Sequence, residues 1–157
     1  MTAANFSERR LNLADMLPGI PVFLASGCDR FRNYPGHTFP FRASSHYLFF
    51  GAPNRSGHVL LILNGEATLY RPAPDADDEV WHGPSESLED LQSRYDFKEI
   101  KTMDELAEDL STLGVDEVLS LPSSDAATNR FIENYLGRVP NLDDDPDVDL
   151  VDAVMEL

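Results

Sequence analysis

The chain has 157 residues, of which 42% are hydrophobic and 10% aromatic. This length fits one domain with a proper core, and the composition is that of a globular protein and excludes a disordered chain. Lys and Arg number 12 against 28 Asp and Glu, which gives a formal net charge of −16. Such a charge repels nucleic-acid phosphates and anionic lipids, so we expect neither nucleic acid nor a membrane surface as a partner.

Cysteine content and hydropathy indicate in which cellular compartment the protein is expected. Cys28 is the single cysteine, which excludes an internal disulfide and a thiolate metal cluster. The N-terminus is polar and charged where a signal peptide needs an apolar core. The longest aliphatic run, 59–63, is far too short to span a bilayer. The sequence therefore predicts a soluble, cytoplasmic protein.

The first predicted element is a helix from about Ser7 to Leu17, which the dipeptide Pro18–Gly19 ends. The stretch "PVFLA" (21–25) predicts the first strand, and a long polar loop follows it. The stretch "YLFF" (47–50) is apolar throughout, which predicts a second strand covered on both faces.

The middle of the chain predicts a hairpin and then helices. Asn64–Gly65 lies between two apolar runs in 58–70, and this dipeptide accepts the positive φ angles of a tight hairpin turn. The segments 73–83 and 85–95 each predict a short helix. Segment 102–114 predicts a longer helix, with a capping box formed by its first residue, a threonine, and the glutamate three positions later.

The remaining elements complete an α/β pattern. Segment 116–122 predicts a strand and 123–137 a helix, whose apolar face comprises Ile132, Tyr135, Leu136 and Val139. The final segment begins an apolar helix that stops without a cap, which suggests truncation. A helix, several strands with a hairpin, and then alternating helices and strands predict an α/β domain with a mixed sheet covered by helices.

No metal site is predicted in this chain. The histidines are scattered without ligand spacing and are expected to be surface or packing residues; they are His37, His46, His58 and His82. Asp143, Asp145 and Asp147 resemble the start of an EF-hand loop, but Val148 and Val154 occupy the required glycine and glutamate positions. We expect a solvated acidic turn there.

No self-sufficient active site is predicted either. Ser56 lacks the first glycine of a nucleophile elbow, and a lone loop cysteine such as Cys28 is usually inert. Glycine-rich phosphate-binding motifs are absent from the sequence. Trp81 either packs in the core or presents its ring to a partner or substrate. For Arg42 we expect a structural role, with its guanidinium holding loop carbonyls or a carboxylate.

The segment "FPFRASSHYLFFGAPNRSGHVLLIL" (39–63) resembles the signature region of the N-terminal domain of aminopeptidase P and its relative prolidase. That region runs aromatic-Pro-aromatic-Arg-x-x-Ser-x-aromatic, then a glycine, then an apolar strand. Trp81–Gly83 matches a Trp-x-Gly segment of the family, and 95–110 and 148–157 follow in the family's order. One departure is Asn54–Arg55, which stands where the family often has an acidic residue.

The resemblance implies an α/β fold of the creatinase/prolidase N-terminal type, related in shape to ribonuclease H, with a mixed sheet of about six strands flanked by helices. It implies that residues 1–142 form this domain. Residues 143–157 would be an acidic linker and the start of a helix leading to a C-terminal catalytic domain absent from this chain. In the family that domain binds two divalent metal ions, usually manganese, so no cofactor and no catalytic or metal residue is expected here.

The implied function is that of a non-catalytic accessory domain of an Xaa-Pro aminopeptidase. Its partners would be its own catalytic domain, further copies in a dimer or tetramer, and peptides with proline in the second position. Trp81 would border the substrate pocket, and Arg42 and Ser45 would be structural anchors. Two alternatives stay open. One is the same domain of a prolidase, and the other is a stand-alone, metal-free peptide-binding module.

Overall fold

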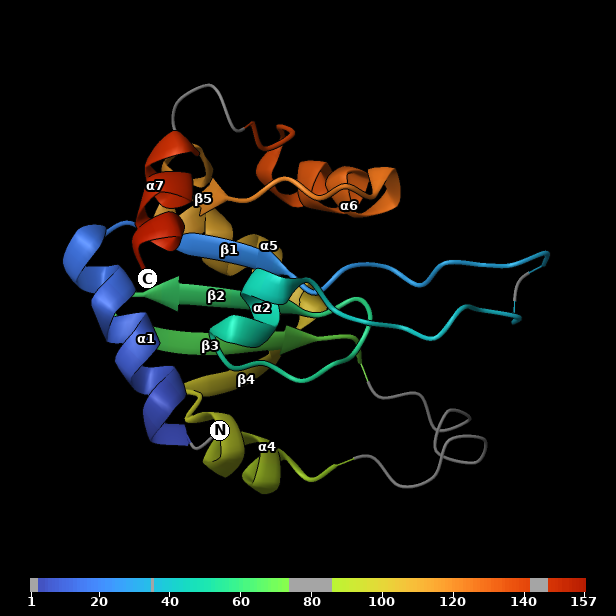
Figure 1. Ribbon diagram of the computed structural model, residues 1–157, viewed down its shortest axis with the longest axis horizontal. Helices are drawn as coiled ribbons and strands as arrows, with labels where there is room; N and C mark the ends of the chain where they lie inside the picture. Colours follow the sequence, from blue (N-terminus) through green and yellow to red (C-terminus); the bar gives the residue numbers. More distant parts are fainter. Residues whose placement is uncertain (1–2, 35, 74–85, 142–146) are drawn as a thin grey trace.

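Five strands form one mixed sheet in the computed structural model, which describes residues 3–34, 36–73, 86–141 and 147–157. The strands are β1 (Val22–Ala25), β2 (Val59–Leu63), β3 (Glu66–Arg71), β4 (Glu99–Thr102) and β5 (Leu119–Ser120). Their order across the sheet is β4-β3-β2-β1-β5. β2 pairs antiparallel with β1 and β3, whereas β5 and β4 add parallel to β1 and β3 (Figure 1).

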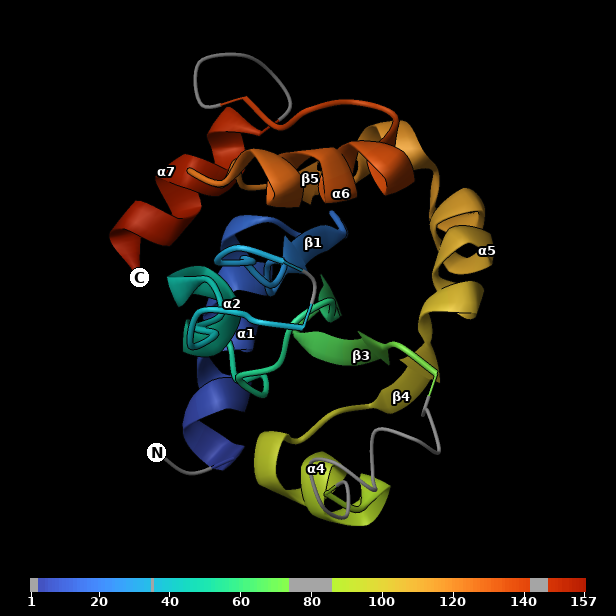
Figure 2. The same ribbon diagram turned by 90° about the vertical axis from the view of Figure 1, so that its right-hand side faces the viewer.

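Helices cover both faces of this sheet, as the two views in Figures 1 and 2 show. One face packs against α1 (Ala3–Met16), α2 (Ser45–Phe49) and α7 (Val148–Glu156). The other packs against α5 (Met103–Leu113) and α6 (Ala126–Leu136). α4 (Leu88–Tyr95) lies beside α1, and a short 3-10 helix, η1 (Val115–Glu117), joins α5 to β5. The α/β architecture with a mixed, helix-flanked sheet is thus confirmed.

Two hydrophobic clusters follow from the alternation of side chains along the central strands. In β1 and β2, Leu24 and Leu60 belong to the cluster under α1, α2 and α7, whereas Phe23 and Leu61 belong to the cluster under α5 and α6. Because successive side chains of a strand point to opposite faces, a strand buried on both faces reads as a continuous apolar run. This explains why the central strands could be predicted.

The hairpin prediction is confirmed. β2 and β3 pair from Val59↔Tyr70 to Leu63↔Glu66, which leaves Asn64 and Gly65 as the turn. Both turn residues have positive φ, 51° and 82°, as a tight hairpin turn of this kind requires. The side chain of Asn64 also accepts a hydrogen bond from the backbone nitrogen of Gly19 at 3.1 Å, which joins the turn to the end of α1.

The predicted second strand, 47–50, is wrong, because these residues belong to helix α2 and its end. The Ser44 hydroxyl caps the helix by accepting a hydrogen bond from the Tyr47 nitrogen at 3.3 Å. Gly51, with φ of 84°, lets the chain turn away after it. Tyr47 and Phe50 lie three residues apart and are both fully buried. A short apolar run cannot by itself distinguish strand from helix, and the sheet therefore has five described strands instead of about six.

Other predicted helices are confirmed with shifted ends. α1 begins at Ala3, α4 and α5 lie where predicted, and the Thr102 nitrogen donates to Glu105 Oε2 at 2.8 Å as the capping box requires. The helix predicted at 73–83 falls outside the described residues except for its first residue. Val139 is not on the face of α6: it follows the cap Gly137 and is 48% exposed. None of the described helices is both long and apolar enough to cross a membrane.

The solvated turn predicted around Asp147 is wrong for that residue, which is only 1% exposed. Its carboxylate accepts hydrogen bonds from the Ser120 nitrogen at 2.9 Å, from the Asn141 nitrogen at 3.1 Å and from the Arg138 guanidinium. Buried charges are stable when they are paired and hydrogen-bonded in this way. Asp147 therefore holds the start of α7 against the edge of the sheet. Asp143 and Asp145 lie outside the described residues.

Between β1 and α2 the chain leaves the body of the domain and returns. Figure 1 shows the two segments running outward together, well beyond the sheet. We call residues 29–34 and 36–40 the arm. Phe31 forms an antiparallel bridge with Thr38, and backbone hydrogen bonds join Arg32 to His37 and Phe39 to Arg30 at 2.8 and 2.9 Å.

Candidate functional site

A groove of about 700 Å³ lies where the carboxyl ends of β1 and β5 come together. Its walls are the loop after β1, the segment that precedes α2 and the loop that enters α6. β1 and β5 are parallel neighbours, so the chain leaves both strands at the same edge of the sheet. Ligands of open α/β sheets bind outside the carboxyl ends of strands, which makes this groove the candidate site.

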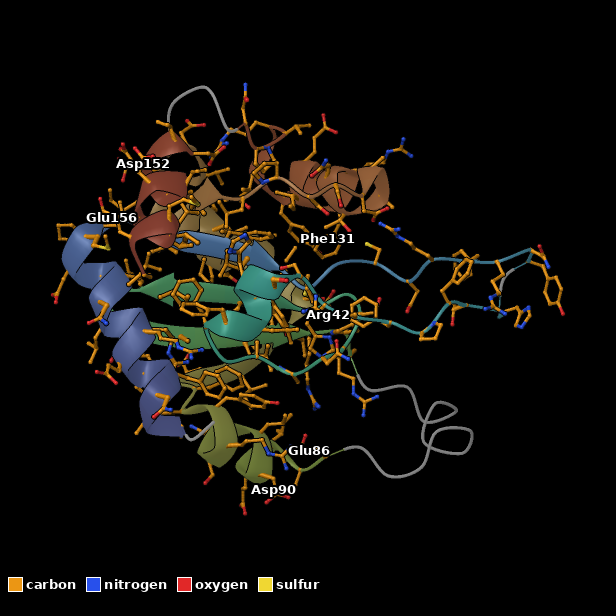
Figure 3. All side chains as sticks on the ribbon, viewed as in Figure 1. Arg42, Glu86, Asp90, Phe131, Asp152 and Glu156 are labelled. Atoms are coloured by element: carbon orange, nitrogen blue, oxygen red, sulfur yellow. The ribbon has the colours of Figure 1, made fainter. Side chains whose placement is uncertain are left out.

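Both polar and aromatic side chains line the groove. The aromatic members are Phe39 and Phe41, and the polar ones are five serines together with Cys28, Arg30, Arg42, His46, Asp125 and Thr128. Figure 3 shows Arg42 at the foot of the arm, beside α2. Apolar walls with a few charged groups are typical of sites that hold a ligand in one orientation.

Asp125 supplies the negative charge of the groove. It caps the N-terminus of α6, and its carboxylate accepts hydrogen bonds from the Thr128 hydroxyl at 2.7 Å and the Thr128 nitrogen at 3.0 Å. These bonds, together with the Arg30 guanidinium 3.5 Å away, lower the pKa of Asp125. The carboxylate is therefore ionised at neutral pH and acts as an acceptor, not as a proton donor.

Cys28 lies in the same groove with a protonated thiol. Partial burial raises its pKa, and the carboxylates of Asp125 and Asp29 raise it further, while a hydrogen bond with Thr128 opposes them. The thiolate is the nucleophilic form of cysteine. Cys28 is consequently a poor nucleophile at neutral pH.

Arg42 and Ser45, the two anchors expected from the sequence, are brought together at the mouth of the groove. Arg42 Nη1 donates to Ser45 Oγ at 3.2 Å and to the Ala43 carbonyl at 3.4 Å. Both side chains are exposed, and these bonds are local. Their anchoring role stays a prediction. Trp81, expected at the rim of a substrate pocket, lies outside the described residues.

Asn54 holds this segment to the loop after α2, and the sequence analysis missed its role. Its Oδ1 accepts a hydrogen bond from the Ala43 nitrogen at 2.7 Å, and its Nδ2 donates to the Phe41 carbonyl at 3.3 Å. An amide can donate and accept at once, whereas an ionised carboxylate only accepts. The sequence shows that Asn54 stands where the family often has an acidic residue. It does not show which groups Asn54 binds, because the two backbone partners lie more than ten residues away.

Ser26 fixes the floor of the groove and was also missed. It is 1% exposed, and its hydroxyl accepts a hydrogen bond from the His58 nitrogen at 2.9 Å. Its backbone nitrogen donates to the His58 carbonyl, and its carbonyl accepts from the Ser44 nitrogen. Burial lowers the pKa of His58 beside it. One small residue thus ties together the end of β1, the start of β2 and the cap of α2.

The described groove presents arginine side chains, one carboxylate, hydroxyls and aromatic rings, which are groups that can contact a ligand. Within residues 3–34, 36–73, 86–141 and 147–157, no three His, Cys, Asp or Glu side chains converge in a way that could hold a metal ion.

Comparison with solved structures identifies the fold. Aminopeptidase P from E. coli in its low-pH form superposes with a TM-score of 0.69 at 19% identity, over 87% of this chain and 32% of that one. A putative aminopeptidase P from Bacillus anthracis gives 0.70 at 17% identity, over 90% and 38%. A variant of the E. coli enzyme in complex with substrate gives 0.69 at 19%. The chain spans about a third of the length of these proteins.

Sequence comparison identifies the family. No curated protein sequence matches the chain significantly. The family model described as "Aminopeptidase P, N-terminal domain" matches residues 6–131, which include most of α1, the whole sheet, the groove lining except Ile132, and the first half of α6. The chain therefore belongs to the family of aminopeptidase P N-terminal domains.

Proposed function

We propose that this chain is the non-catalytic accessory domain of an Xaa-Pro aminopeptidase, which releases an N-terminal residue that precedes proline. The observation that carries the proposal is the family match over residues 6–131. The five-stranded fold shared with aminopeptidase P supports it. Hydrolysis would be the work of a C-terminal domain that would bind two divalent metal ions, most commonly manganese, and these ions would supply an activated water for cleavage of the peptide bond.

The accessory role has two parts in this proposal. The domain contributes to a dimer or tetramer, and it narrows access to the catalytic domain so that short or unstructured peptides with proline in the second position reach the metals. The groove beside Arg42 supports the second part, because its charged and aromatic lining suits a peptide. We assign Trp81 to the rim of the substrate pocket, and Arg42 and Ser45 to anchoring the segment before α2.

We also propose a cytoplasmic location. Cys28, the only cysteine, is free. Disulfides form and persist in oxidising extracellular environments, whereas cytosolic thiols remain reduced.

The test uses the protein encoded by the complete gene, loaded with Mn²⁺. It should release the first residue of a peptide that begins Xaa-Pro and leave the matched Xaa-Ala peptide intact. Trp81→Ala should lower kcat/KM about tenfold or more, while metal content stays unchanged, and Trp81→Phe should keep most of the activity. A metal-loaded protein with no Xaa-Pro activity contradicts the proposal. Unchanged kinetics in Trp81→Ala contradict the assignment of that residue.

Experiments on the same protein also test two alternative functions. A prolidase accepts Xaa-Pro dipeptides only, so hydrolysis of a pentapeptide that begins Xaa-Pro rules it out. A stand-alone peptide-binding module is favoured by the groove itself. It predicts that the 157-residue chain binds Xaa-Pro peptides without metal, measured by isothermal titration calorimetry, and that no peptidase activity accompanies the complete gene product.

A further inference from the structure

The turn between β2 and β3 contains a dipeptide that is prone to chemical modification. Asn64–Gly65 is the one place in the sequence where glycine follows asparagine. In such a pair the backbone nitrogen of the glycine can attack Cγ of the asparagine amide, because glycine has no side chain to obstruct the approach. A bond from that nitrogen to Cγ forms, the C–N bond of the amide breaks, and ammonia leaves with the proton of the attacking nitrogen. Water then opens the five-membered succinimide at either of its two carbonyls, which gives aspartate or isoaspartate.

The folded turn holds this pair in a conformation from which the ring cannot close. Both residues have positive φ, 51° and 82°, and they connect the paired residues Leu63 and Glu66. Positive φ at both positions defines a type I′ turn, whose first residue has ψ of about +30°. Since the substituents of Cα lie about 120° apart around the Cα–C bond, the torsion from Cβ of Asn64 to the Gly65 nitrogen is about 150°. A five-membered ring needs these two atoms nearly eclipsed, so the nitrogen lies on the far side of Asn64 from Cγ.

Contacts with α1 and the residues after it keep the turn in this conformation. The Gly19 nitrogen donates a hydrogen bond to Asn64 Oδ1 at 3.1 Å, which fixes the amide that would have to move. Leu11 packs against Gly65, where an added Cβ would lie 2.7 Å from Leu11 Cδ2. Figure 1 shows α1 beside this end of the β2–β3 hairpin. Rotation of Asn64 toward ring closure would break these contacts, so the turn must open first.

We propose that Asn64 is a deamidation site controlled by the opening of this turn. While the turn is closed, the Gly65 nitrogen cannot reach Cγ and the reaction is blocked. Each opening frees the Asn64 backbone to rotate, and the ring can then close. Asn64 is exposed in the folded protein, so water reaches it in either state. Because ammonia is lost, the reaction is irreversible, and the amount of product records how often the turn has opened.

The two products should differ in their effect on the hairpin. Aspartate at position 64 keeps a side-chain oxygen that can accept the hydrogen bond from the Gly19 nitrogen. Isoaspartate instead carries the main chain through the former side chain, which adds one carbon to a two-residue turn. The length of such a turn fixes the register of the strands that it joins. Isoaspartate should therefore loosen the end of the hairpin that contacts α1.

The experiment is peptide mapping by mass spectrometry on the protein encoded by the complete gene, incubated at neutral pH. The fraction of aspartate and isoaspartate at position 64 is followed with time in native buffer and in denaturing urea. The rate in native buffer should be at least about tenfold lower, because only molecules with an open turn react. Low concentrations of urea should raise the native rate little, since opening a turn exposes little surface. Asn12, which precedes Leu13, is the internal control and should react slowly in both solutions.

Two leucine variants test the contact that keeps the turn closed. Leu11→Ala removes the side chain that packs on Gly65, so it should raise the native rate at least about threefold and leave the rate in denaturing urea unchanged. Leu88→Ala is the matched control, because Leu88 of α4 is 46% exposed, close to the 55% of Leu11, and lies away from the turn. Equal rates in native buffer and in denaturing urea overturn the inference. Equal effects of the two variants also overturn it, as does a native rate that rises with urea as steeply as global unfolding does.

Discussion

The Arg138 guanidinium donates hydrogen bonds from both terminal nitrogens to the Asp147 carboxylate, and its Nη2 also donates to the Val118 carbonyl at 2.7 Å. This pair joins the segment after α6 to Asp147, the N-cap of α7, and to Val118, the residue before β5. Its position makes it the main polar contact that we expect to hold α7 in place.

Asp147→Asn should therefore lower the free energy of unfolding by about 2–4 kcal/mol, because a partly buried guanidinium loses its counter-charge. Urea denaturation measures this change. Asp149→Asn, on the exposed side of the same helix, should change the free energy by less than about 0.5 kcal/mol. Equal effects of the two substitutions would show that the buried ion pair stabilises the fold no more than an exposed carboxylate does.

Gly51 is required by its surroundings as well as by its backbone. Its φ is 84°, and a Cβ at this position would lie 2.7 Å from Cβ and Cδ1 of Phe6 in the core. Gly51→Ala should cost about 2–4 kcal/mol, the sum of left-handed strain and core overpacking. Gly19 has a similar φ of 76° but open space around it, so Gly19→Ala should cost only about 1 kcal/mol. Thermal and urea unfolding of both variants separate the two costs, because Gly19→Ala adds backbone strain alone and Gly51→Ala adds both strain and overpacking.

The stability of the protein should depend on pH through Asp125. Hydrogen bonds from Thr128 hold the folded-state pKa of Asp125 below its unfolded value, near 3.9. The resulting stabilisation is present above the unfolded pKa and is lost as the pH falls through the folded pKa. The free energy of unfolding should thus fall less steeply below pH 4 in Asp125→Asn than in wild type, and Thr128→Val should give an intermediate slope. If the free energy of unfolding depends on pH in the same way in wild type and in Asp125→Asn, the prediction is contradicted.

Cys28 should react slowly with thiol reagents. Because burial and the nearby carboxylates raise its pKa, the thiolate is scarce at neutral pH. The rate of alkylation by iodoacetamide should reach half its maximum at a higher pH than for a free cysteine, near 8.5. Unfolding in urea should return it to that value. A reaction midpoint at or below about 8.5 in the native protein would contradict the raised pKa of Cys28.

The parts of the fold that the sequence predicted are those in which one local signal decides. Asn64–Gly65 between apolar runs determines a hairpin, and Thr102 with Glu105 determines a helix start. The strand predicted at 47–50 was wrong because a run of four apolar residues is too short to show the periodicity of a strand or of a helix. The signal that distinguishes the helix is its N-cap, Ser44.

The groove could not be predicted, because distant segments build it. Ser26 meets His58, and Asn54 meets Ala43, through backbone contacts that leave no pattern in the chain. Asp147 looked like part of an acidic turn for the same reason. Its partner amide belongs to a strand 27 residues earlier.

The same carboxylate also occupies part of an edge of the sheet. β5 is an edge strand, and its Leu119 nitrogen bonds inward to Pro21, so the Ser120 nitrogen faces outward. An outward edge amide is a template on which a foreign strand can add, the first step of aggregation. Because Asp147 occupies that amide at 2.9 Å, and β5 has only two residues, this side of the sheet offers an incoming strand no free donor at Ser120. The contact that holds the last helix in place thus also occupies a donor with which a foreign strand could otherwise pair at this edge.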